Sequence, residues 1–136
     1  MMVPWLAIFG VTLTTVAAMT STGMILLAAR WQTIEVWAYG GARRPWPVWA
    51  LAGLLLILWG LALRDFAMRP EGTRSWAGWC LVVGIPALWA IKSMALVFNP
   101  RGRAAVSSIS GDRAWRRIGL ARLPIAIVLA ALTMLA

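Results

Sequence analysis

Residues Trp46–Leu63 read WPVWALAGLLLILWGLAL, eighteen consecutive positions without a charged side chain. A bilayer core about 30 Å thick is spanned by roughly 20 apolar residues in a helix, so this run predicts a transmembrane helix. Arg64 and Asp65 follow immediately and mark the point where the helix should reach the membrane surface.

Three further stretches have the same character, and with Trp46–Phe66 they fill most of the chain. They are Val3–Ala29, Trp76–Phe98 and Ile118–Leu135. Hydrophobic residues make up 62% of the chain, well above the level of about half in soluble domains. We therefore predict an all-α integral membrane protein with a single domain over 1–136. Its four transmembrane helices, at about 3–29, 46–66, 76–98 and 115–135, should form an antiparallel bundle.

The arginines divide unevenly between the loops. Cytoplasmic loops of membrane proteins carry an excess of Lys and Arg. Loops one and three of a four-helix protein share a side, and here they hold eight arginines against three in loop two. We therefore expect loops one and three in the cytoplasm, both termini on the non-cytoplasmic side, and a multi-pass location in a bacterial inner membrane.

Tryptophan, which is enriched at membrane–water interfaces, supports the same boundaries. Trp115 is one of those expected in the cytoplasmic belt. In the first loop, Trp31, Ile34 and Trp37 have the spacing of one helical turn lying in the interface. Pro45 and Pro47 should then start the second helix.

The net charge of +9 comes from 13 basic and 4 acidic residues. In a soluble chain this excess would point to nucleic acid, but here the arginines crowd the helix ends, where anionic lipid headgroups lie. Histidine is absent and Cys80 is the only cysteine, so haem and zinc lack their commonest ligands. No P-loop, GxSxG, CxxC or HExxH motif occurs. We expect the bilayer and anionic lipids as partners, no nucleic acid, no cofactor, no metal and no enzymatic activity.

Two cations lie inside the predicted helices. Lys92 belongs to the third helix, and Arg122 to the fourth, five residues after Arg117. Helices joined by a short loop are antiparallel neighbours, so both cations should reach a similar depth, a turn or two from the cytoplasmic surface. A charge at the middle of the bilayer costs at least about 2.5–3.5 kcal/mol. No intramembrane acid in this chain can pair with either cation.

Two interpretations of this pair remain open. Both side chains are long enough to reach the headgroups from a buried position. Alternatively, they form a basic pocket for a lipid phosphate, a carboxylate on another subunit or an anionic substrate. Asn99, seven residues after Lys92, should lie on nearly the same helix face. The predicted anion-, lipid- or partner-binding residues are Lys92, Asn99, Arg101, Arg103, Arg113, Arg116, Arg117 and Arg122.

The sequence also predicts how the helices pack. Gly53 and Gly60, seven residues apart, should form a close-packing face on the second helix. A face of the first helix at Ile8, Thr12, Thr15, Met19 and Thr22, with small residues beside it, should do the same. Pro86 should kink the third helix, either as a purely structural feature or as a hinge. Ser110 or Asp112 should cap the fourth helix, and Asp112 has the spacing to pair with Arg116.

These observations favour a small non-catalytic membrane protein, an accessory or assembly subunit of a larger membrane complex or a homo-oligomer. Its basic cytoplasmic face would bind anionic lipid or a partner carboxylate. The alternative is a small oligomeric transporter or channel for an anionic or amphiphilic substrate, with Pro86 as hinge and Lys92 as anion site. An enzyme acting on lipid-linked anions is a third interpretation, which lacks an evident base or nucleophile beyond serine and Asp112.

Overall fold

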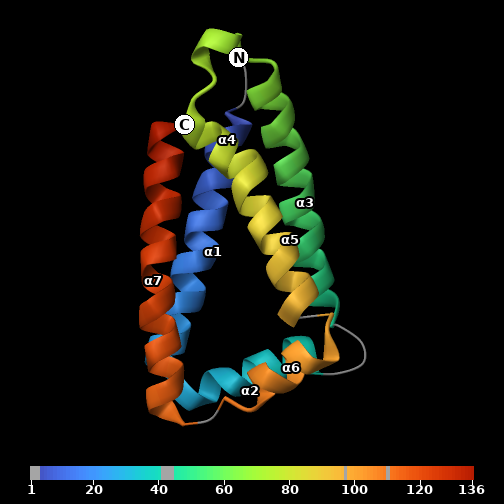
Figure 1. Cartoon of the computed structure of the whole chain (residues 1–136), viewed down its shortest axis with the longest axis vertical. Helices are drawn as coiled ribbons and strands as arrows, with labels where there is room; N and C mark the ends of the chain where they lie inside the picture. The colour runs from blue at the N-terminus through green and yellow to red at the C-terminus, as the bar shows by residue number, and fades with distance from the viewer. Residues whose placement is uncertain (1–3, 41–44, 97, 110) are drawn as a thin grey trace.

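The computed structural model describes residues 4–40, 45–96, 98–109 and 111–136, which form helices and no strand. Helical elements follow one another along the chain with short connections (Figure 1). They are α1 (Trp5–Leu27), η1 (Ala28–Arg30), α2 (Trp31–Glu35), η2 (Val36–Gly40), α3 (Trp46–Ala67), η3 (Glu71–Thr73), α4 (Trp76–Trp79), η4 (Cys80–Gly84), α5 (Ile85–Leu96), α6 (Pro100–Ser107) and α7 (Asp112–Leu135).

Four helical runs are long and apolar enough to cross a membrane, as predicted. They cover Trp5–Ala38, Trp46–Ala67, Trp76–Leu96 and Asp112–Leu135. The third run ends two residues before the expected Phe98, and the fourth begins three residues before the expected Trp115. Both termini lie at one end of the molecule, and the first and third connections lie at the other (Figure 1). The side of the membrane on which each end lies stays a prediction.

The most extensive helix contact is between α1 and α7, which run side by side in opposite directions (Figure 1). Glycines allow this close approach at two positions along the helix pair, Gly10 on α1 and Gly119 on α7. A Cβ atom on Gly10 would collide with the side chain of Thr133. A Cβ on Gly119 would stand 2.9 Å from the carbonyl oxygen of Ser21 and 2.9 Å from the Cβ of Met24. Small residues at such contacts let helix backbones come together in lipid, where dispersion replaces the hydrophobic effect as the driving force.

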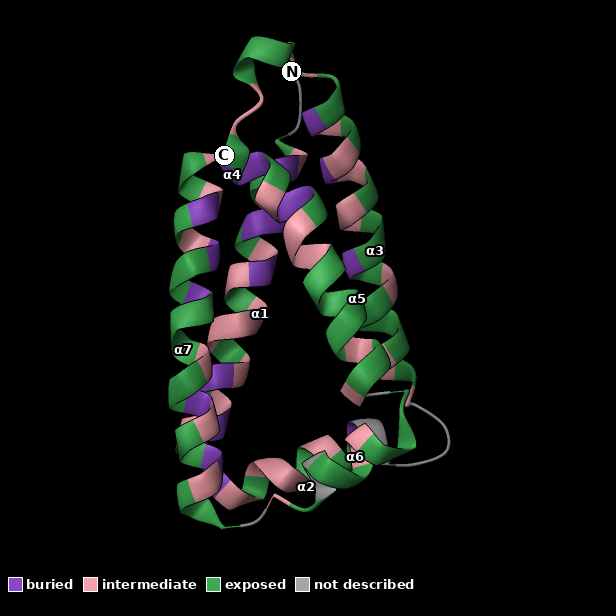
Figure 2. Cartoon of the chain, viewed as in Figure 1, coloured by how far each residue is buried: buried purple, intermediate pink, exposed green. Residues whose placement is uncertain are grey.

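The main hydrophobic core gathers near the end that carries the termini (Figure 2). Phe66 and Trp79 pack edge to face there, with ring centroids 5.0 Å apart. Gly78 leaves room for the Phe66 ring. The buried core residues are Leu6, Phe9, Leu13, Leu55, Ala62, Phe66, Ala77, Leu81, Val82, Leu129 and Leu132. Towards the opposite end, exposed residues dominate α3 and α5 (Figure 2).

Pro86 interrupts the backbone hydrogen bonds of the third span, and a side chain of α3 replaces the missing donor. Proline has no N–H, so the carbonyl four residues earlier, on Val82, loses its helical donor. The indole Nε1 of Trp59 on α3 donates to the Val82 oxygen at 2.8 Å. The backbone just before the proline widens into the single π-helical turn η4. A neighbouring helix therefore satisfies the carbonyl that Pro86 frees, as expected for a proline in a membrane helix.

Two packing predictions are wrong. A Cβ built on Gly53 or on Gly60 meets no atom within 4 Å, so these glycines face away from the other helices of this chain. On α1 the buried residues are Leu6, Phe9, Gly10, Leu13, Ser21 and Met24, whereas Thr15, Met19 and Thr22 are exposed. The hydroxyls of Thr12 and Thr15 donate to carbonyl oxygens four residues earlier, which lets them face an apolar medium.

Trp115 also departs from its expected place. It is only 2% exposed and lies in the first turn of α7, in the part of that helix that packs against α1. It therefore fills the helix interface instead of standing in the interfacial belt. Trp37, Trp46 and Trp49 are exposed near the same end of the molecule, where an interfacial belt needs them.

Candidate anion-binding site

A layer of short helices closes the end opposite the termini. It consists of α2 and η2 (31–40) and α6 (100–107), which lie across the long axis of the molecule (Figure 1). We call it the basal layer. The first-loop part confirms the predicted helical turn around Trp31, and α6 is an additional helix that the sequence analysis did not place. Helices that lie flat with exposed Ile34, Val36 and Trp37 suit a membrane interface.

The corner between α5 and α6 is built by Asn99 and Gly102. The Oδ1 atom of Asn99 accepts a hydrogen bond from the backbone N–H of Arg101 at 3.0 Å, and Pro100 starts α6. A Cβ on Gly102 would overlap the carbonyl group of Ala95, so only glycine lets α6 fold back so closely onto α5. Because α5 ends at Leu96, Asn99 does not continue the helix face of Lys92, and that prediction is wrong.

Lys92 and Arg122 belong to the third and fourth spans, on α5 and α7, as the sequence predicts. Lys92 is exposed on α5, and Arg122 is half-buried on α7. Their charges are near enough to act on each other, and the carboxylate of Glu35 in the basal layer is near enough to act on Lys92. No ion pair forms among these three residues, and a hydrogen bond of 2.9 Å from Trp31 Nε1 holds Glu35 Oε1. The cluster carries two positive charges and one negative charge.

The remaining predicted arginines surround the basal end. Arg113, Arg116 and Arg117 are exposed on the first turns of α7 and, with Asp112 and Leu120, line a shallow hollow. Arg101 is exposed and Arg103 half-buried on α6. Within the described ranges, Arg101, Arg113, Arg116 and Arg117 have no carboxylate within 4.0 Å. This end of the protein is therefore a surface of largely uncompensated positive charge.

Asp112 neither caps α7 nor pairs with Arg116. Its Oδ1 atom accepts a hydrogen bond from the backbone N–H of Ala29 at 3.0 Å. At that point α1 ends through Ala28, which is buried with φ of 50° and ψ of −122°. A positive φ is costly for a residue with a Cβ, and Asp112 fixes the chain just beyond it. Ser110, the other proposed cap, lies outside the described residues.

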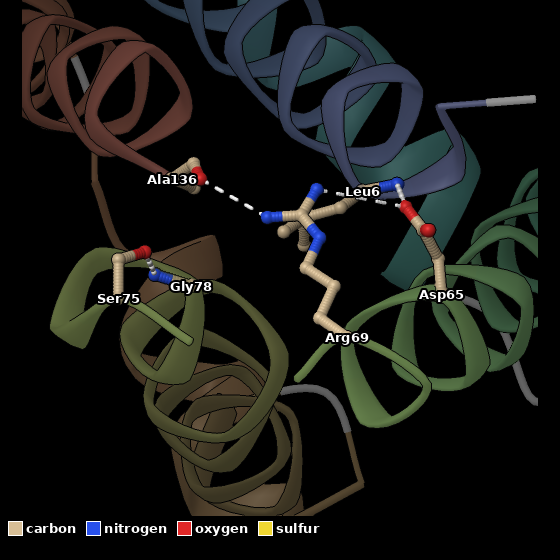
Figure 3. A network of polar contacts seen from close by, with 6 residues as sticks. All are labelled: Leu6, Asp65, Arg69, Ser75, Gly78 and Ala136. Atoms are coloured by element: carbon tan, nitrogen blue, oxygen red, sulfur yellow. Dashed lines mark hydrogen bonds and ion pairs between the residues drawn. The ribbon is translucent and has the colours of Figure 1, made fainter. Parts of the chain in front are cut away.

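At the end that carries the termini, Asp65 and Arg69 form a set of polar contacts between helices, which we call the polar clamp (Figure 3). The sequence did not predict it. Asp65 Oδ2 on α3 accepts a hydrogen bond from the backbone N–H of Leu6 at 3.1 Å and lies 3.8 Å from Arg69 Nη2. Arg69 Nη1 donates to the carbonyl oxygen of Ala136 at 3.1 Å. The clamp thus joins the start of α1, the end of α3 and the end of α7. The spacing of four between Asp65 and Arg69 was its only sequence signal.

The predicted site residues are mainly cations, which can bind an anionic group. The part of the chain that the structure describes contains no group of three or more His, Cys, Asp or Glu residues that could hold a metal ion. The eight predicted site residues divide into an inner pair, Lys92 and Arg122, a capping residue, Asn99, and the five arginines of the basal end. Comparison with family models, curated proteins and solved structures finds no match to this chain.

Proposed function

We propose that this chain is a non-catalytic multi-pass membrane protein whose basic end binds anionic lipid headgroups or a carboxylate on a partner. One observation carries the proposal. Arg101, Arg113, Arg116 and Arg117 have no carboxylate partner among the described residues, because the nearby acids serve other groups. Glu35 accepts from Trp31, and Asp112 accepts from the Ala29 backbone. Uncompensated arginines at a helix end are placed to bind phosphate headgroups.

The proposed role is that of an accessory or assembly subunit of a larger membrane complex, or of a protomer in a homo-oligomer. Spans two and three support it, since only 11% of the most apolar window of each is buried within the chain, against 22% for spans one and four. Gly53 and Gly60 present an open, small-residue surface on α3. Such surfaces permit close helix contact with a neighbouring protein.

The proposed orientation places the basal end in the cytoplasm of a bacterial cell and both termini across the inner membrane. The excess of arginine in loops one and three supports it. A reporter that is active only in the cytoplasm should therefore give no signal when fused after Ala136. The same reporter inserted after Ser108 should give a strong signal. Strong activity from the Ala136 fusion would overturn the orientation.

Lipid binding at the basal end is tested by the triple variant Arg113→Gln, Arg116→Gln, Arg117→Gln. Each basic residue near an anionic surface contributes about 1 kcal/mol, so removing three should lower the enrichment of phosphatidylglycerol over phosphatidylcholine at least about tenfold. The measurement is the lipid content of the purified protein after equilibration with vesicles of both lipids.

The matched control for this test is at the opposite end of the molecule. Arg64→Gln removes an exposed arginine from the last turn of α3, and it should change the enrichment less than Arg117→Gln does. If the triple variant kept the full preference of the unmodified chain for phosphatidylglycerol, the basal arginines would not be the lipid-binding surface.

A further inference from the structure

The hollow at the start of α7 brings charged and apolar side chains of one helix face together. It is lined by Asp112, Arg113, Arg116, Arg117 and Leu120. Its volume is about 530 Å³, within the range of about 300–1,000 Å³ that small-molecule sites occupy. Residues three and four apart are neighbours on a helix surface, so the three arginines can contact one ligand together.

The charges in the hollow sum to two positive units, since three arginines face one aspartate. None of the three arginines has a carboxylate within 4.0 Å among the described residues. The Oδ1 atom of Asp112 accepts from the backbone N–H of Ala29, and no donor in the described part of the chain is hydrogen-bonded to Oδ2. The hollow therefore suits a ligand that carries two negative charges and a hydroxyl group that can donate to Asp112.

Apolar side chains continue the exposed face of α7 from the hollow towards the middle of the span. Leu120 is 58% exposed and lies three residues beyond Arg117, about 4.5 Å along the helix. Ile127 is 65% exposed and lies about two turns further on the same face. The buried residues of α7, Trp115 and Gly119 among them, belong to the other face, which packs on α1. A ligand held by the arginines would therefore have an open apolar surface beside it, as the acyl chains of a lipid require.

We infer that this hollow binds one diphosphoglycerol headgroup, that of cardiolipin, with its two phosphates on the three arginines and its central glycerol hydroxyl donating to Asp112. This inference rests on the proposed function and names the lipid that occupies one part of the basal end. Two phosphodiesters carry two negative charges, which equal the net positive charge of the hollow. Guanidinium groups bind phosphate oxygens through paired hydrogen bonds. A headgroup with one phosphate would leave half of the charge uncompensated, and inorganic phosphate would leave Leu120 and Ile127 uncovered.

Native mass spectrometry of the purified protein tests the site, after equilibration in mixed micelles with equal amounts of cardiolipin, phosphatidylglycerol and phosphatidylcholine. The unmodified chain should retain one cardiolipin, with a preference over phosphatidylglycerol of at least about tenfold. Arg113→Gln, Arg116→Gln and Arg117→Gln should each lower that preference about fivefold, the factor expected for one arginine at an anionic surface.

Two control variants separate a defined site from diffuse surface charge. Arg101→Gln removes an exposed arginine of α6 that does not line the hollow, so it should lower the preference less than any of the three. Arg64→Gln acts at the opposite end, far beyond the screening length of about 10 Å, and should leave the preference unchanged. If Arg101→Gln lowered the preference as much as Arg117→Gln, the overall charge of the basal end would hold the lipid, and the inference would be overturned.

Asp112→Asn tests the hydroxyl contact through a ratio between two lipids, which misfolding cannot imitate. Asparagine keeps an oxygen for the Ala29 N–H, but it replaces the second acceptor by an amide and removes the negative charge. The unmodified chain should prefer cardiolipin at least about fivefold over the analogue in which hydrogen replaces the central hydroxyl. Asp112→Asn should retain both lipids equally. Equal retention by the unmodified chain would overturn the assignment of the headgroup.

Failure of this inference can be told from failure of the proposed function. If the unmodified chain prefers both anionic lipids over phosphatidylcholine without distinguishing them, or retains two phosphatidylglycerols in place of one cardiolipin, the inference is overturned and the proposed function stands. If it prefers neither anionic lipid, the inference fails together with the lipid-binding part of the proposed function. Displacement of cardiolipin by millimolar inorganic phosphate would identify a site for free anions and would also overturn the inference.

Discussion

Replacing Asp65 by leucine is expected to destabilise the folded protein by about 2–3 kcal/mol, mainly through the loss of one acceptor for a buried backbone donor. Leu6 lies in the first turn of α1, where a helix has no partner of its own for its N–H groups. Asp65 Oδ2 supplies that partner, and its side chain is only 12% exposed. A carboxylate at a helix N-terminus also interacts favourably with the helix dipole, by about 0.3–1 kcal/mol.

The same substitution disturbs α7 through Arg69. Asp65 helps to hold the guanidinium group that donates to the carbonyl oxygen of Ala136 (Figure 3). Arg69 is 30% exposed, so its ion pair with Asp65 is partly screened and adds little by itself. The loss should therefore come chiefly from the orphaned N–H of Leu6, with a smaller part from freer motion of Arg69.

Unfolding by denaturing detergent in mixed micelles, followed by tryptophan fluorescence, measures this effect. Asp65→Asn keeps an oxygen acceptor and should cost less than half as much as Asp65→Leu. Glu71→Gln removes the same charge from an exposed position of the neighbouring loop and should leave stability unchanged. Equal unfolding curves for Asp65→Leu and the unmodified chain would show that the clamp contributes nothing to stability.

The four spans were predictable because a bilayer demands long, apolar, internally hydrogen-bonded helices, and composition alone reports those. The partners of each helix face were harder to predict. Gly53 and Gly60 have the spacing of a packing face, yet glycine is equally tolerated on an open face, and in this chain that face is open. Gly10 and Gly119, which do make close contacts, have no comparable repeat. Spacing shows that two residues share a face, but it does not show what lies opposite.

The candidate site was partly predictable for the same reason. The placement of Lys92 and Arg122 on the third and fourth spans follows from the apolar runs that contain them. The position of Glu35 depends on how the first loop folds beneath the bundle, where η2 packs against α6, and that tertiary contact has no local sequence pattern. Likewise, the hydrogen bond from the Ala29 backbone N–H to Asp112 joins residues 83 positions apart, and no local sequence pattern predicts it.

Gly119→Leu should produce the second large effect, a destabilisation of about 3 kcal/mol, at the upper end of the usual cost of overpacking. The added Cβ would stand 2.9 Å from the Ser21 carbonyl oxygen, and a backbone atom in the middle of α1 cannot move aside alone. The Leu side chain would also have to displace Met24 and Ile25. We expect α1 and α7 to separate around Gly119, and the loss should appear in the same detergent-unfolding measurement.

The chain supplies a matched control for this prediction. Gly53→Leu makes an identical substitution within a membrane span, and a Cβ at Gly53 meets no atom within 4 Å. It should leave the stability of the isolated protomer within about 0.5 kcal/mol, the range of substitutions that touch no packed neighbour. If both substitutions were equally harmful, the cost would arise from replacing glycine in a helix of any environment, and the close contact of α1 with α7 would not explain it. If Gly53→Leu altered only an oligomer and Gly119→Leu altered the protomer, the two glycines would mark an external and an internal helix contact respectively.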